Sequence, residues 1–276
     1  MQKNEQIETM IRATEVLTKA QVKRVRSLQQ KKFRVAEGLF VAEGDKCIEE
    51  LMRGFRLEHL YREGENATRA EIEQMSSLRT PQGSIGVFRL PSREPITDNR
   101  EPITPFERGT GGFDLVVALD GVQDPGNLGT IIRTCDWFGV RRMVCSRDTA
   151  DCYNPKVVQA TMGALARVRV EYVDLPEWLA SINREPKTGN REPNMPIIGT
   201  LLEGEDMYQV LREPITDNRE PKILVMGNEG NGLSEEVRNL VTHKIRIPSY
   251  PKNVETSESL NVSIATGIIL AYLRHM

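Results

Sequence analysis

From residue 113 onward, short apolar runs alternate with longer segments in which apolar residues recur at helical spacing. The apolar runs predict six strands, at residues 114–119, 142–146, 168–173, 195–201, 223–226 and 244–247. Helices are predicted to begin near Asn127, Asn154, Pro176, Asp206, Ser234 and Ser257. Continuously apolar strands that alternate with helices are typical of a parallel sheet covered on both faces. The pattern predicts an α/β fold, in which ligands bind beyond the carboxyl ends of the strands.

The first ninety residues follow a different pattern, with fewer strands and a basic segment. Strands are predicted at 38–44, 57–61 and 84–90, and a helix at 45–53 that Gly54 ends. Seven basic residues and no acidic ones lie between Val16 and Ala36. Such a segment is either a solvated helix face or a patch that contacts phosphates, and this segment alone favours neither. The pattern predicts a small α/β unit.

These two patterns divide the chain into a first domain at 1–91, a linker at 92–112 and a second domain at 113–276. Arg-Glu-Pro occurs six times, in pairs at 93–102, 184–193 and 212–221. Proline excludes a heptad helix, and the copies are too few for a stacked repeat protein. We interpret them as inserted surface loops, because lengthening a loop costs little entropy. A proline-rich docking motif is the alternative.

Composition narrows the function classes. The 276 residues include 37 Lys and Arg against 39 Asp and Glu, so any contact with nucleic acid must be a local patch. The four cysteines form no CxxC pair and the three histidines are scattered, which favours neither a zinc site nor a disulfide framework. The N-terminus is polar, and no apolar run is long enough to span a membrane. We therefore expect a cytoplasmic protein without metal.

Three loops after predicted strands of the second domain carry candidate chemistry, and each is ambiguous alone. Residues 227–232, GNEGNG, either cradle a phosphate or form a turn before a helix capped by Ser234. Asn127 and Arg133 suit a structural cap or pair as well as a site, and Ser259 suits a helix cap. The loops lack both the Lys-Ser/Thr of a P-loop and the spacing of GxGxxG, which argues against a dehydrogenase.

Taken together, the loops resemble the three motifs of the SpoU family, the S-adenosylmethionine-dependent RNA ribose 2′-O-methyltransferases of the SPOUT class. They read NLGTIIR at 127–133, GNEGNGLS at 227–234 and SLNVSIA at 259–265. The resemblance covers residues 113–276. The stretches RSLQQKKFRVAEGLFVAEG and SLRTPQGSIGVF look like the small RNA-recognition domain that precedes many of these enzymes.

The resemblance implies a fold, a methyl donor and partners. The parallel-sheet catalytic domain should end in a deep trefoil knot, an exception to the rule that chains are unknotted. S-adenosylmethionine should bind within the knot loops, in a homodimer whose active site lies near the subunit interface. The substrate should be structured RNA, rRNA rather than tRNA, with no membrane and no metal involved. A tRNA methyltransferase and a non-catalytic RNA-binding assembly factor with this fold are the alternatives.

The same resemblance assigns roles to residues. Asn127 and Arg133 should act at the ribose and its phosphate, Glu229 should orient one of them, and Ser259 with Asn261 should flank the reacting hydroxyl. The donor pocket should include Thr200, Gly227, Ile247 and Leu260, and RNA should be contacted by Lys23, Arg24, Lys31 and Lys32. One departure is clear: where the family often has Ile-Pro-Met-x-Gly, this chain has IPSYP at 247–251 and a longer loop to Ser259.

Overall fold

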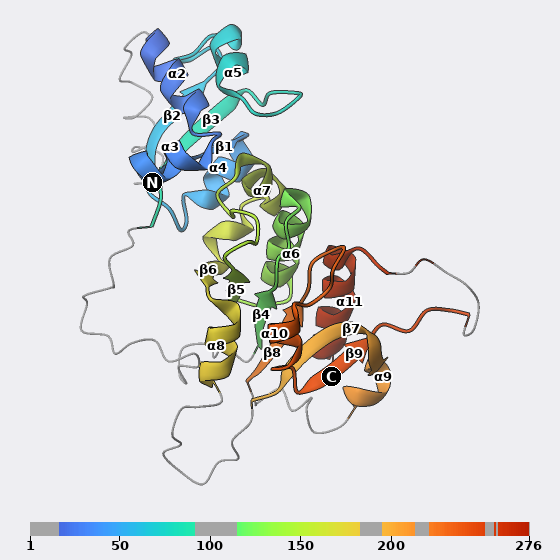
Figure 1. Ribbon diagram of the computed structural model, residues 1–276. Coiled ribbons are helices and arrows are strands. Elements are labelled where there is room, and N and C mark those ends of the chain that lie inside the picture. Colours follow the sequence, from blue (N-terminus) through green and yellow to red (C-terminus); the bar gives the residue numbers. More distant parts are fainter. Residues whose placement is uncertain are drawn as a thin grey trace. The chain divides into compact units, whose positions relative to one another are not determined.

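A computed structural model describes residues 17–91, 115–182, 195–212, 221–251, 257 and 259–275 (Figure 1). The linker and the three repeats lie outside these residues, apart from Arg212 and Pro221 at the ends of the third repeat. The chain forms two compact units, Met1–Pro95 with Asp151–Arg167, and Ile96–Ala150 with Val168–Met276. The sequence placed residues 151–167 in the second domain, whereas they pack within the first unit. The domain boundaries at 92 and 113 remain predictions.

The second unit is built on a six-stranded sheet in the order β6-β5-β4-β8-β7-β9, and every neighbouring pair is parallel. Its strands are β4 (Leu115–Leu119), β5 (Arg142–Ser146), β6 (Arg169–Val173), β7 (Ile197–Asp206), β8 (Lys222–Met226) and β9 (His243–Arg246). Every residue of β4 and β8 is buried, as expected for central strands covered on both faces. The predicted parallel α/β sheet is confirmed.

The helices of this unit begin at side-chain caps. They are α6 (Pro125–Trp137), α8 (Leu175–Ile182), α9 (Met207–Val210), α10 (Glu235–Arg238) and α11 (Val262–His275), and α11 packs along α6 (Figure 1). The Ser234 hydroxyl caps α10. The predicted start of the last helix near Ser257 is wrong, and Ser259 is not its cap. The Asn261 Oδ1 atom accepts from the backbone N–H groups of Ser263 and Ile264, which fixes the first turn at Val262.

The strand order changes direction between β4 and β8. From β4 the chain adds β5 and then β6 on one side, whereas β8, β7 and β9 lie on the other. In open parallel sheets, ligands bind in the crevice beyond the carboxyl ends of the strands at such a switch point. The loops that follow β4 and β8 are the first two of the three candidate loops.

The first unit has a three-stranded antiparallel sheet in the order β1-β3-β2. Its elements are α2 (Lys19–Ser27), α3 (Lys31–Glu37), β1 (Leu39–Glu43), α4 (Asp45–Leu51), β2 (Leu57–Arg62), α5 (Arg69–Met75), β3 (Ser84–Arg89), α7 (Pro155–Thr161) and the 3-10 turn η1 (Ala164–Ala166). Helix α7 packs on β1. No helix in the described part of the chain is long and apolar enough to cross a membrane.

Arg34 holds the first unit together. Its side chain is buried, donates to the carbonyl oxygens of Leu28 and Gln29, and forms an ion pair with Asp151 at 2.6 Å. The basic segment forms the two helices α2 and α3. Of its seven basic residues, Arg34 has a structural role. The contact with Asp151 is 117 residues distant in sequence, which explains why sequence pattern did not place 151–167 here.

Candidate active site

The three candidate loops meet in a row of hydrogen bonds beyond the carboxyl ends of the strands. The Asn127 Nδ2 atom donates to Glu229 Oε1 at 2.9 Å, and Asn261 Nδ2 donates to Asn127 Oδ1 at 2.9 Å. The carboxylate of Glu229 accepts only, so the amide nitrogen of Asn127 must face it. Its amide oxygen then faces Asn261. The row from Glu229 through Asn127 to Asn261, here called the polar row, has one consistent direction.

Asn127 and Asn261 each also form hydrogen bonds at the start of a helix. The backbone N–H of Asn127 donates to Asp124, the cap of α6, at 2.8 Å. The Asn261 Oδ1 atom accepts from the Ser263 hydroxyl at 2.6 Å as well as from the first backbone N–H groups of α11. Asn261 therefore caps one helix and contacts the start of another. Packing of α11 against α6 is what brings these two residues together.

Glu229 lies in a closed turn, which Asn228 organises. Asn228 and Gly232 exchange both backbone hydrogen bonds, at 2.9 and 3.0 Å. The Asn228 side chain accepts from the N–H groups of Gly230 and Asn231 and donates to the Gly121 carbonyl oxygen at 2.7 Å. Because these N–H groups are already satisfied, the loop is a turn that presents an exposed Glu229. It does not form a phosphate cradle.

One close approach requires a glycine in this region. A Cβ atom on Gly227 would lie 2.3 Å from the Gly232 carbonyl carbon, so the turn closes only on a glycine. The loop after β4 is held by Ser146, whose hydroxyl accepts from the Gly121 N–H at 2.8 Å and donates to Asp148 at 2.5 Å. Sequence reasoning singled out neither Asn228 nor Ser146. The signal for Asn228 was its place in a glycine-rich turn, where asparagine commonly bonds its own backbone.

Arg133 lies six residues after Asn127 on α6, about 1.7 helical turns, and is exposed. Its side chain makes no hydrogen bond or ion pair with any residue that the structure describes. A guanidinium stays protonated and presents five donors, so it suits an oxyanion ligand. Ser259 is also exposed and makes no hydrogen bond within the described residues. The structure thus joins Asn127, Glu229 and Asn261 directly, and leaves Arg133 and Ser259 open to a ligand.

Three of the four predicted donor-pocket residues lie in or directly after the neighbouring strands β7, β8 and β9. Half-buried Thr200 of β7 lies opposite Ile245 of β9, Gly227 directly follows β8, and half-buried Ile247 directly follows β9. Their positions at one edge follow from the order β8-β7-β9. Leu260 lies just before α11 and is 50% exposed. The arrangement offers backbone groups, one hydroxyl and apolar side chains.

One feature of β7 was not predicted. Its pairing with β9 shifts, so that both Thr200 and Glu205 lie opposite Ile245. The intervening residues leave the ladder next to Thr200. A Cβ atom on Gly204 would lie 2.4 Å from the Ile245 carbonyl carbon, so only glycine permits the strand to return at this point.

The predicted RNA-contacting residues all lie in the first unit. Lys23, Lys31 and Lys32 are exposed, and the Lys32 ammonium lies 4.9 Å from the Phe33 ring centroid. Arg24 is also exposed but forms an ion pair with Glu37 of α3. Within the described residues, no group of three or more His, Cys, Asp or Glu side chains is placed to hold a metal ion.

Two family models and a curated relative match this chain. The model of the SpoU rRNA Methylase family matches residues 114–271, and that of the MRM3-like substrate binding domain matches residues 19–80. The 23S rRNA (guanosine(2553)-2′-O)-methyltransferase RlmP of Bacillus subtilis (strain 168) is 26% identical over 269 residues, which cover 92% of this chain and 95% of that protein.

Solved structures agree over nearly the whole chain. A putative RNA methyltransferase of the TrmH family from Porphyromonas gingivalis has a TM-score of 0.76 and 34% identity, covering 95% of this chain and 99% of that one. The AdoMet-bound rRNA methyltransferase from Sinorhizobium meliloti has a TM-score of 0.72 and 29% identity, covering 94% and 95%.

Proposed function

Because the chain belongs to the SpoU rRNA methylase family, we propose that it transfers a methyl group from S-adenosylmethionine to a ribose 2′-hydroxyl of rRNA. The observation that carries the proposal is the polar row, which joins side chains of all three candidate loops at the switch point of the sheet. The Bacillus subtilis relative is named for this reaction on 23S rRNA, and the Sinorhizobium meliloti structure is described as AdoMet-bound.

The residues at the edge of β7, β8 and β9 fit the donor. Thr200, Gly227 and Ile247 combine backbone polar groups with a hydroxyl and an apolar side chain, which suits a ligand with a nucleoside and an amino-acid part. S-adenosylmethionine supplies a methyl group that its sulfonium centre already activates. The work left to the protein is alignment of the hydroxyl and removal of its proton. Holding reactants in attack geometry contributes about 7–11 kcal/mol.

We assign the alignment to the polar row and its exposed neighbours. Glu229 fixes Asn127, and Asn127 fixes Asn261, so neither amide can rotate freely. We propose that Ser259, which is exposed two residues before Asn261, bonds the ribose hydroxyl. Arg133 holds a phosphate next to that ribose through paired N–H donors.

The proton of the reacting hydroxyl need not go to Arg133. A guanidinium is protonated throughout the working pH range and cannot serve as a base. When the 2′-oxygen gains the methyl group, its proton becomes strongly acidic, so a weak base is sufficient. A phosphate oxygen held by Arg133, or water beside it, accepts that proton.

We further propose that the second unit ends in a deep trefoil knot and forms a homodimer. The adjacency of β7 with both β8 and β9, and the return of α11 to α6, support the knot. The dimer is supported by exposed apolar side chains on these two helices, Trp137 at 83% and Ile264 at 56% exposure.

The first unit is proposed to bind the RNA. Its match to a substrate binding domain and the exposed Lys23, Lys31 and Lys32 support this role. Arg24 is expected to contribute less because Glu37 already neutralises it. We also propose that the protein acts in the cytoplasm, and its likeness to the Bacillus subtilis rRNA methyltransferase supports this location.

The test is a pair of matched variants. Asn127→Ala should abolish methyl transfer to RNA, because it removes the centre of the polar row. Asn239→Ala, at an exposed asparagine that ends α10, is the control and should be active. S-adenosylmethionine at 100 times its dissociation constant should stabilise both variants by about 2.7 kcal/mol. Activity of Asn127→Ala equal to that of the control would contradict the proposed role of the row.

A further inference from the structure

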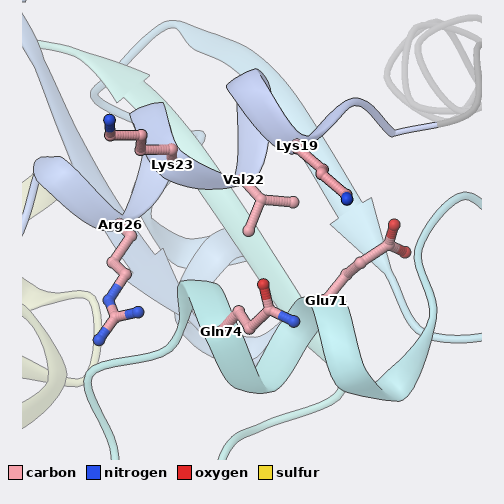
Figure 2. A pocket seen from close by; sticks show the side chains of 6 residues that line it. All are labelled: Lys19, Val22, Lys23, Arg26, Glu71 and Gln74. Carbon is pink, nitrogen blue, oxygen red and sulfur yellow. The ribbon is translucent and has the colours of Figure 1, made fainter.

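A groove between α2 and α5 in the first unit has properties that suit the backbone of RNA. Two adjoining hollows, of about 330 and 400 Å³, share Arg26 and Gln74. Figure 2 shows the first of them, with Val22 between the two helices and Lys19 and Arg26 toward opposite ends. Its lining side chains are Lys19, Val22, Lys23, Arg26, Glu71 and Gln74. We call the two hollows the α2/α5 groove.

The cations of the groove come from one face of one helix. Lys19, Lys23 and Arg26 are spaced four and three residues apart, which aligns them along α2 over roughly 10 Å. All three side chains are exposed, and none makes a hydrogen bond or ion pair with any residue in the described ranges. Arg24, between them in sequence, faces elsewhere and is neutralised by Glu37.

The acidic side chains near the groove are already engaged. Glu71 completes the capping box of α5 by accepting from the N–H and hydroxyl of Thr68, and these hydrogen bonds hold its pKa below the usual value for a glutamate. Glu73, which lines the second hollow, forms an ion pair with Arg69. Three unpaired cations therefore face one carboxylate that already has partners in the first hollow. The groove as a whole attracts anions.

We propose that the α2/α5 groove binds a stretch of the sugar–phosphate backbone of the RNA substrate, with Lys19, Lys23 and Arg26 on phosphates and Gln74 on a ribose hydroxyl. None of the lining side chains is aromatic, so the groove does not offer a platform for stacked bases. Recognition here follows backbone shape and charge, as is usual for structured RNA. This inference rests on the proposed function and identifies where the first unit would grip its substrate.

The main test replaces all three cations with glutamine, which keeps the helix propensity of α2. Binding of the full-length protein to transcribed 23S rRNA is measured across a salt series. Losing three phosphate contacts should reduce the slope of log K against log salt by about 2 to 3. With phosphate contacts screened out at 1 M salt, affinity one decade lower, at 0.1 M, should fall roughly 100- to 1000-fold.

The matched control removes the same charge elsewhere in the first unit. Lys46, Arg79 and Lys156 are exposed and make no ion pair within the described residues, and their triple glutamine variant should keep nearly the wild-type slope. An equal loss of slope in both triple variants would mean that binding is diffuse and would overturn the groove. No loss in the Lys19, Lys23 and Arg26 variant would overturn it as well.

A second pair of variants tests the floor of the groove without touching α2. Gln74→Glu adds a negative charge where the two hollows meet, and should weaken binding to 23S rRNA at least several-fold. Gln82→Glu adds the same charge at another exposed glutamine of the first unit and should not. Equal affinities for these two variants would count against the groove.

Failure of this inference can be told from failure of the proposed function. If the groove is wrong but the methyl transfer is right, the triple glutamine variant methylates 23S rRNA and loses no more affinity than the control triple variant. If the function is wrong, the wild-type protein itself transfers no methyl group to RNA. If the groove is right, the variant should show a raised KM for RNA with kcat unchanged, because the groove lies outside the methyl-transfer site.

Discussion

Asn261 has two roles that a pair of substitutions should separate. Its Oδ1 atom caps α11 by accepting from the N–H groups of Ser263 and Ile264, and its Nδ2 atom donates to Asn127 at 2.9 Å. Aspartate keeps the cap but has no donor for Asn127. Alanine loses both. We therefore expect Asn261→Asp and Asn261→Ala to be equally inactive and unequally stable.

The size of each effect follows from the structure. Losing an asparagine cap costs about 1 kcal/mol, which in a unit of this size lowers the melting temperature by about 2–4 °C. Aspartate is as good a cap as asparagine, so Asn261→Asp should melt within about 1 °C of the wild type. In Asn261→Asp, a carboxylate faces the Asn127 oxygen and displaces it. A shift of about 1 Å in an aligning group costs about 100-fold in rate.

The assay combines thermal melts with single-turnover methyl transfer at saturating RNA. The expected outcome is a loss of at least about 100-fold in rate for both variants, with a fall in melting temperature for Asn261→Ala alone. Wild-type activity in Asn261→Asp would refute the claim that the polar row aligns the reaction. An unchanged melting temperature in Asn261→Ala would refute the cap.

Three further predictions concern the fold. Arg34→Ala should cost about 3–5 kcal/mol in denaturant unfolding, because it leaves Asp151 without its cation and Asp151 is largely buried; a cost below 1 kcal/mol would mean that the pair is not structural. Gly204→Ala should lose soluble folded protein, since its Cβ would meet the Ile245 carbonyl carbon at 2.4 Å, and recovery of a wild-type circular-dichroism melt would show that β7 bends differently. All four cysteines are buried, so a thiol reagent at pH 8 should label none before unfolding and four after it. Labelling of the native protein at pH 8 would contradict that burial. Burial also raises the pKa of the Cys47 thiol from 9.0 to about 11. The stability that the neutral thiol contributes should therefore fall as the pH rises from about 9 toward 11.

Much of the second unit could be predicted from pattern because its strands are continuous apolar runs. The structure begins and ends β5 at Arg142 and Ser146, the predicted bounds. Prediction was poorer where a contact between distant residues decides the outcome. The shift of β7 on Ile245 depends on crowding at Gly204, and the start of α11 depends on the Asn261 cap.

The candidate site shows the same division. The motifs identified Asn127, Glu229 and Asn261, but spacing could not show which amide atom of Asn127 faces which partner. Those bonds join residues 102 and 134 positions apart. Asn228 was missed because its side chain bonds backbone N–H groups within its own turn. In the basic segment, residue type and spacing could not separate the buried Arg34 and the paired Arg24 from Lys19, Lys23 and Arg26, which have no ion pair within the described residues.

The most direct test of the central claim is transfer of a labelled methyl group from S-adenosylmethionine to total RNA from a strain that lacks this protein. Nuclease digestion then identifies the labelled nucleoside. We expect a single 2′-O-methylated nucleoside in rRNA, formed by the wild type and not by Asn127→Ala. A label on a base, or no label on either naked RNA or ribosomal particles while the donor still binds, would contradict it.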